Sequence, residues 1–139
     1  MTAAAIESKP PSKALHIALW VVQVLLGLAF LMAGTMKATK PIAELATQMP
    51  WAGAIPEALV RFIGVSEFLG GLGLILPSAL RIQPKLTPIA ASGLTLIMIL
   101  AGGFHTMRGE AGLPINLVMG GLAAFIAWGR FAKAPIAPR

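Results

Sequence analysis

Four long runs of this sequence contain neither lysine nor arginine, and this limits the folds open to the chain more than any other feature. The runs are residues 14–36, 62–80, 86–107 and 111–129. Each is close to the roughly 17 to 25 residues that a helix needs to cross the hydrocarbon core of a bilayer. Charged residues make up 12% of the 139-residue chain, about half the share found in soluble domains. The sequence therefore predicts an all-α bundle of four transmembrane helices.

The predicted organisation is a single four-helix transmembrane domain, residues 14–131, between two short tails, 1–13 and 132–139. The expected spans are about 14–36, 60–80, 86–107 and 111–130. The first span follows two lysines and resembles a secretory signal, but its 23 residues exceed the apolar core of such a signal, about 7 to 15 residues. We therefore expect a retained helix. The carboxyl-terminal tail is rich in proline and alanine and is expected to be frayed.

The basic residues that separate the spans predict an orientation. In a four-span chain, both tails share one side with the loop between the second and third spans. That side holds seven of the eleven basic residues: Lys9, Lys13, Arg81, Lys85, Arg130, Lys133 and Arg139. The positive-inside rule then puts both termini in the cytoplasm, with anionic lipids near these cations. The basic residues form no stripe with interleaved aromatics, so nucleic-acid binding is not expected.

The first outer loop, residues 37–61, is the longest connection between spans. In it, Ile42, Leu45 and Met49 recur at helical spacing, and Trp51 follows. This pattern predicts a short interfacial helix that partly covers the outer end of the bundle, although a plain connector of two turns would read the same way. All three tryptophans lie where an interfacial aromatic belt would place them.

A few polar residues interrupt the apolar spans, and these are the candidate functional residues, because hydrocarbon disfavours them. They are Lys37, Glu67, His105 and Asn116. All four fall in the predicted outer half of the bilayer, and each shares a helix face with glycine or alanine. Since small residues mark close helix contacts in membranes, the four side chains are predicted to face the bundle interior as one polar cluster.

Three motifs with small residues four positions apart are predicted contact points between helices. They are Ala29 with Ala33, Ser66 with Gly70, and Gly120 with Ala124. The same faces would serve a homo-oligomer equally well, so the sequence leaves the oligomeric state open.

The polar cluster admits three interpretations. A carboxylate at this depth is costly, so Glu67 is expected either to be protonated or to pair with Lys37 or His105. Such a pair could simply brace the four helices. It could also form the polar end of an apolar pocket that hydrogen-bonds a quinone, a lipid or another lipid-soluble ligand. A proton relay through Glu67 and His105 is the third interpretation.

Several classes of chemistry are not expected of this chain. With no cysteine, it has no disulfide, iron–sulfur cluster or thiolate metal site. His16 and His105 lie near opposite faces of the membrane, so they cannot ligate one haem within a monomer. We predict no metal site, no intrinsic cofactor and no catalytic residues, because no complete catalytic constellation is present. Whether the chain takes part in an enzyme is left open.

The motifs that carry a family resemblance are the run from Gly27 to Gly34 before Lys37, the run 64–73 around Glu67, and the residues His105 and Asn116. In these motifs the sequence resembles the DoxX-like family of small four-helix bacterial membrane proteins. The resemblance covers about residues 14–130 and implies a multi-pass protein of the bacterial plasma (inner) membrane. It implies an accessory or ligand-binding subunit of a membrane redox system, a quinone-linked oxidoreductase, with the four polar residues at the positions that match the family's polar pattern. Any oxidoreductase activity would then require a partner enzyme subunit.

Two alternative functions come from other classes. A small proton-coupled transporter would also have four helices and one membrane-embedded glutamate. However, small multidrug-resistance transporters carry that acid in the first span, where this chain has only Gln23 and His16 as polar candidates. The second alternative is a structural or assembly protein of the membrane that binds no ligand.

Overall fold

The computed structural model describes residues 12–139 and consists of helices, with no strand in that part of the chain. The elements are α1 (Lys13–Thr39), α2 (Ile42–Gln48), the 3₁₀ turn η1 (Pro50–Gly53), α3 (Glu57–Leu80), α4 (Leu86–Met107), α5 (Leu113–Trp128) and the π-helical turn η2 (Gly129–Lys133). The predicted four-helix bundle is confirmed, and its spans correspond to α1, α3, α4 and α5 with η2. The predicted tail 1–13 lies outside the described residues except for Ser12 and Lys13.

Four helices are long and apolar enough to cross a membrane. Large apolar side chains on their outer surfaces are exposed, among them Met32 of α1, Leu69 of α3, Ile99 of α4 and Leu117 of α5. A soluble protein would bury most of this surface, whereas lipid tails solvate it. The interior contains a smaller apolar core that includes Leu26, Phe30, Leu74, Leu94 and Met98.

Helices α1 and α3 form an antiparallel pair whose close contact depends on glycines spaced seven residues apart on each helix. A Cβ added to Gly34 would lie 2.6 Å from the backbone oxygen of Gly64, and one added to Gly71 would lie 2.8 Å from that of Gly27. No side chain fits at these crossings, so the two backbones approach closely. This pairing places residues of α1 directly opposite residues of α3 along the whole interface.

The predicted small-residue contacts are partly wrong. Ala29 and Ala124 are exposed, whereas Gly120 packs against Met98 of α4 and Gly70 packs against Leu94. Alanine is common on lipid-facing surfaces as well as at interfaces, so spacing alone does not select the buried pair. The glycines that admit a neighbouring backbone are the ones that mark the interface.

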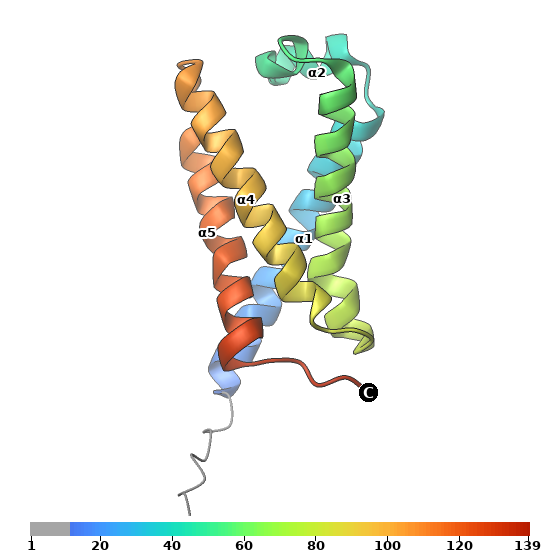
Figure 1. The fold of residues 1–139 in the computed structure, drawn as a ribbon, viewed down its shortest axis with the longest axis vertical. Helices are drawn as coiled ribbons and strands as arrows, with labels where there is room; N and C mark the ends of the chain where they lie inside the picture. The colour runs from blue at the N-terminus through green and yellow to red at the C-terminus, as the bar shows by residue number, and fades with distance from the viewer. Residues whose placement is uncertain (1–11) are drawn as a thin grey trace, which may run out of the picture.

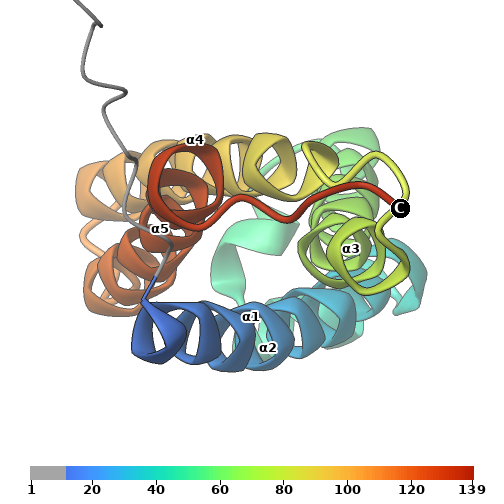
Figure 2. The same cartoon turned by 90° about the horizontal axis from the view of Figure 1, so that it is seen from below.

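Helices α4 and α5 form a second pair, and the two pairs make a V (Figure 1). The pairs converge where α1 begins and α5 ends, which we call the closed end. They separate toward α2 and the turn between α4 and α5, which we call the open end. Seen from the closed end, the α1–α3 pair and the α4–α5 pair lie as two layers (Figure 2).

A buried arginine holds the closed end together. Arg130 is 3% exposed, and its guanidinium donates hydrogen bonds to Gln23 Oε1 at 2.6 Å and to the backbone oxygen of Ala134 at 2.8 Å. It also lies 3.0 Å from His16 Nδ1. Gln23 in turn donates to the backbone oxygen of Leu74 at 2.8 Å. The network thus joins α1, α3 and the end of α5, whereas the sequence placed Arg130 among the cytoplasmic surface cations.

The carboxyl-terminal tail is ordered rather than frayed, which corrects the sequence-based expectation. Ala134 is fully buried beneath Arg130. The tail then crosses the closed end to the loop between α3 and α4 (Figure 2). There the Arg81 side chain donates to the backbone oxygen of Ala137 at 2.8 Å, and the backbone nitrogen of Arg139 donates to that of Arg81 at 3.1 Å. The tail acts as a strap because both of its ends are hydrogen-bonded.

The predicted short helix of the first loop is present as α2, and the turn η1 follows it. These two elements lie across the open end beside α3 (Figure 1). Leu45, Trp51 and Ala52 are buried there together with Val60 of α3. This second, smaller core fixes the loop as a cover at the open end of the V.

Candidate functional site

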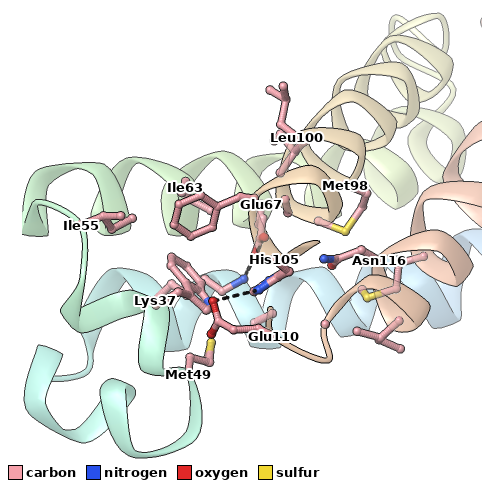
Figure 3. Close-up of a pocket in the computed structure, with 18 of the residues that line it drawn as sticks. Lys37, Met49, Ile55, Ile63, Glu67, Met98, Leu100, His105, Glu110 and Asn116 are labelled. Carbon is pink, nitrogen blue, oxygen red and sulfur yellow. Dashed lines mark hydrogen bonds and ion pairs between the residues drawn. The ribbon is translucent and has the colours of Figure 1, made fainter. Parts of the chain in front are cut away.

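The open end contains a cavity of about 750 Å³ between the two helix pairs and beneath the cover of α2 and η1. Most of its lining is apolar, including Phe30, Ile63, Met98, Phe104 and Met119. The four predicted polar residues all line it, each from a different long helix: Lys37, Glu67, His105 and Asn116. Figure 3 shows Lys37, Glu67 and His105 close together, with Asn116 facing them from α5. Their role in binding stays a prediction.

The charged part of the site is an ion pair between α1 and α3. Lys37 Nζ lies 2.9 Å and 2.8 Å from the two carboxylate oxygens of Glu67. The carboxylate side chain is 2% exposed and the lysine side chain 13%. The glycine crossing at Gly34 and Gly64, one turn away on each helix, brings the two residues opposite each other. Of the two partners expected for Glu67, the structure therefore selects Lys37.

Arg61 fixes the end of α1 from which Lys37 projects. Its guanidinium donates to the backbone oxygens of Lys37 at 2.9 Å and Lys40 at 2.6 Å. It also pairs with Glu57 one turn earlier on α3, at 3.1 Å. These bonds satisfy carbonyl groups that a helix end leaves unpaired, and a cation is favourable at that end of the helix dipole. The sequence reading had placed Arg61 only as a loop cation.

His105 belongs to a second polar group, at the turn between α4 and α5. Its Nδ1 lies 3.7 Å from Glu110 Oε1, and the same oxygen accepts a hydrogen bond from Arg108 Nε at 2.5 Å. The imidazole also meets the ring of Trp51 edge-on, with centroids 6.2 Å apart. A Cβ on Gly112 would lie 2.7 Å from the imidazole, so only glycine leaves room for the ring there.

Two buried nitrogen atoms in the cavity wall have no hydrogen-bond partner within the described residues. They are Nδ1 of His105 and Nδ2 of Asn116. A buried donor left unpaired costs about 1 to 3 kcal/mol, and a hydrogen-bond acceptor that reached either atom would relieve that cost. In Figure 3 the amide of Asn116 points toward the cavity from α5, near His105.

Trp51 forms part of the cavity wall rather than an interfacial belt, which corrects its sequence-based assignment. The residue is buried, and its ring lies 5.6 Å from Lys37 Nζ, within cation–π range. Trp51 thus contacts both polar groups, the ion pair on one side and His105 on the other. The sequence did not predict that Trp51 contacts both polar groups or that Glu110 lies beside His105. Both residues lie in loops, where no helical periodicity indicates which way a side chain points.

The chemistry available to this site is recognition of a small, mostly apolar molecule. The ion pair is internally neutralised, while His105 and Asn116 offer hydrogen bonds at the same end. Among residues 12–139, no group of three or more His, Cys, Asp or Glu side chains could hold a metal ion. Volume and lining are typical of ligand pockets, which measure about 300 to 1,000 Å³ and combine an apolar wall with a few polar groups.

Comparison with known protein families gives one match. Residues 21–129 match the family described as the DoxX-like family, and the match covers α3, α4 and α5 in full and α1 in part. No curated protein and no solved structure matches the chain. The family match and the four apolar helices together identify a multi-pass integral membrane protein.

Proposed function

We propose that this chain, which belongs to the DoxX-like family, binds a quinone or a similarly built lipid-soluble molecule in its open-end cavity, as the membrane subunit of a redox system. The observation that carries the proposal is the pair of unpartnered nitrogens, His105 Nδ1 and Asn116 Nδ2. Asn116 donates through its amide, and His105 donates in the tautomer that carries its proton on Nδ1. A quinone offers carbonyl acceptors on an apolar ring, which fits donors at one end of an apolar cavity.

The charge distribution favours an uncharged head group. Both oxygens of Glu67 accept from Lys37, so neither charge remains available for an ionic ligand. An anionic ligand would have to draw Lys37 away from the buried carboxylate of Glu67. A cationic ligand would have to draw that carboxylate away from Lys37. Each would leave a buried charge without its partner, which costs several kcal/mol in protein interiors.

The redox part of the proposal assigns electron transfer to a partner enzyme subunit. The chain contains no cysteine with which to carry a cluster or a dithiol. In this arrangement it holds and orients the quinone near the surface where α2 and η1 lie. The partner then reduces or oxidises the bound molecule.

The two alternatives account for less of the site. Transport needs access from both sides, whereas the cavity is lined from the open end only and the Arg130 network fills the closed end. A purely structural brace explains the Lys37–Glu67 pair. It gives no reason for two residues that each carry an unpartnered buried nitrogen, His105 and Asn116, to line a large cavity.

Quenching of Trp51 fluorescence tests the proposal, since this ring lies in the cavity wall. Trp20 and Trp128 are replaced by phenylalanine, and the protein is titrated in lipid nanodiscs with a benzoquinone that has the ubiquinone head but no tail. We expect saturable quenching. Asn116→Leu and His105→Phe should each weaken the affinity by about tenfold, because one hydrogen bond contributes about 0.5 to 1.5 kcal/mol.

Matched controls come from neighbouring positions outside the cavity. Thr106 follows His105 and Leu117 follows Asn116; both are exposed and neither lines the cavity. Thr106→Ala and Leu117→Ala should bind the quinone as the parent protein does. Quenching that never saturates, or equal affinities in site and control variants, would contradict the proposal.

A further inference from the structure

The cavity continues into a second hollow, a shallow groove of about 320 Å³ between α3 and α4. The groove is almost entirely apolar, and its lining residues are Ser66, Leu69, Gly70, Ala90, Gly93, Leu94 and Ile97. Ser66 and Ile97 line both the cavity and the groove, so the two hollows meet at these residues. The groove then runs along the helix pair toward the closed end.

Glycines create the depth of this groove. Gly70 lets Leu94 pack against the backbone of α3, because a Cβ there would lie 2.6 Å from the leucine side chain. Gly93 is exposed, and a Cβ built on it would meet nothing within 4 Å. The groove is therefore an open channel on the outer surface of two membrane-spanning helices, where lipid chains would lie.

The cavity itself opens to the same side. Among its lining residues, Leu59 and Phe62 of α3 and Leu100 of α4 have exposed side chains. Ile115 of α5 is also exposed, and the apolar groove next to the cavity lies on the α3–α4 side. In Figure 3, Leu100 projects away from the polar residues of the site.

We infer that the ligand of this protein is an amphiphile with one uncharged polar head and a long apolar tail, whose tail leaves the cavity between α3 and α4 and lies in the Ser66–Ile97 groove. This inference rests on the proposed function and specifies the class of ligand. His105 and Gly93 are twelve residues apart on α4, so the tail would run about 18 Å from the head to the part of the groove at Gly93. A tail-less solute would leave the groove unused.

Entry from the bilayer follows from this placement. Lipid already solvates an apolar tail, so the groove adds little hydrophobic driving force and serves mainly as a path. The head moves into the cavity between α3 and α4 while the tail stays in an apolar medium throughout. The cover of α2 and η1, anchored by Leu45 and Trp51, stands over the head on the other side.

Photolabelling tests the position of the tail directly. The probe is a benzoquinone with a long alkyl tail that carries a diazirine near its end, added to the full chain in nanodiscs. After irradiation, mass spectrometry locates the labelled residues. We expect label in the groove segments 66–70 and 90–97. An excess of the tail-less quinone should reduce this label at least several-fold, because it occupies the head site.

Two glycine variants provide a matched pair. Gly93→Phe places a ring in the groove at a position where an added Cβ meets nothing within 4 Å, and Gly103→Phe lies on the same helix, is equally open at Cβ and lines neither hollow. We expect Gly93→Phe to lower groove labelling and the affinity for the tailed probe by about tenfold, while Gly103→Phe changes neither. Both variants should bind the tail-less quinone as the parent does, which shows that they are folded.

The outcomes separate this inference from the proposed function. If the parent binds the tail-less quinone but groove label does not respond to it, or Gly93→Phe behaves as Gly103→Phe does, the tail path is wrong and the cavity proposal stands. If the parent binds neither quinone, both are overturned. Label confined to α1 or α5 would place the exit on the other side and also overturn the inference.

Discussion

A carboxylate inside a membrane bundle is stable when its charge is matched, and Glu67 meets this condition through Lys37. Both of its oxygens are engaged by one ammonium group at 2.8 and 2.9 Å, with almost no exposure of the carboxylate. Removal of one partner leaves the other as an isolated charge. The main effect of the pair on stability is therefore the large loss of folding free energy that follows when one partner is removed.

We predict that Glu67→Leu and Lys37→Met each destabilise the protein by about 3 kcal/mol, because each leaves a buried charge unpaired. The double variant Lys37→Met with Glu67→Leu should recover most of that loss, since it removes both charges together. The measurement is unfolding in mixed micelles of increasing dodecyl sulfate content, followed by circular dichroism. Additive losses in the double variant would show that the two residues do not act as a pair.

At the level of single residues, the sequence indicated the site only where helical periodicity applied. Lys37, Glu67, His105 and Asn116 could be placed on small-residue faces, and the structure brings them to one cavity. Loop residues such as Trp51 have no such periodicity, so their direction could not be inferred. The cavity itself arises from the divergence of two helix pairs, which no local pattern encodes.

Arg130 was missed for a different reason. It follows an apolar run, and the positive-inside rule counts such an arginine as a surface cation. A signal was nevertheless present in α1, where Gln23 shares the helical face of the buried residues Leu19, Leu26 and Phe30. An uncharged amide on a core face requires a hydrogen-bond partner from another helix, and Arg130 supplies it.

Among the elements, the α1–α3 pair determines the geometry of the site, because its glycine crossings set the separation of Lys37 and Glu67. The sequence indicated the helices and their antiparallel order, but it did not indicate which small residues meet. Contact depends on the rotation of each helix about its axis. The sequence contains the seven-residue spacing of Gly27 with Gly34 and of Gly64 with Gly71. The sequence analysis considered only small residues four positions apart, so it did not identify these glycines.

Gly34→Ala should separate α1 from α3, since the new Cβ would lie 2.6 Å from one backbone atom and 2.9 Å from another. Backbone atoms cannot move aside as a flexible side chain can, so we predict a loss of about 2 kcal/mol, typical of overpacking. Gly103→Ala is the control, because its Cβ meets nothing, and helix propensity should leave it neutral or slightly more stable. Thermal unfolding of both variants in the same detergent measures the difference, and equal melting temperatures would disprove the close crossing.

For the whole molecule, the helical order places the amino-terminal end of α1, the α3–α4 loop and the carboxyl-terminal strap at the closed end (Figures 1 and 2). The charge bias of the sequence predicts that this end faces the cytoplasm and that the cavity lies in the outer half of the membrane. The fold alone does not indicate which end of the bundle faces the cytoplasm, whereas the distribution of basic residues predicts it.

Cysteine labelling of intact bacterial cells checks this orientation without background, because the chain has no cysteine of its own. Ala54, after η1, and Lys85, before α4, are both exposed and lie in loops at opposite ends. A membrane-impermeant maleimide should label Ala54→Cys in intact cells and Lys85→Cys only after permeabilisation. The reverse pattern would mean that the cavity faces the cytoplasm.

The separation of the two polar networks also bears on how such a chain evolves. Residues that seal the closed end, such as Arg130 and Gln23, are not among those that line the cavity. Substitutions in α2, in η1 or at the α4–α5 turn therefore alter the cavity wall without weakening that seal, because effects at distant sites are largely independent. Under the proposed function, natural selection could exchange one lipid-soluble ligand for another on an inherited frame, and diverse binding specificities could descend from one ancestral bundle.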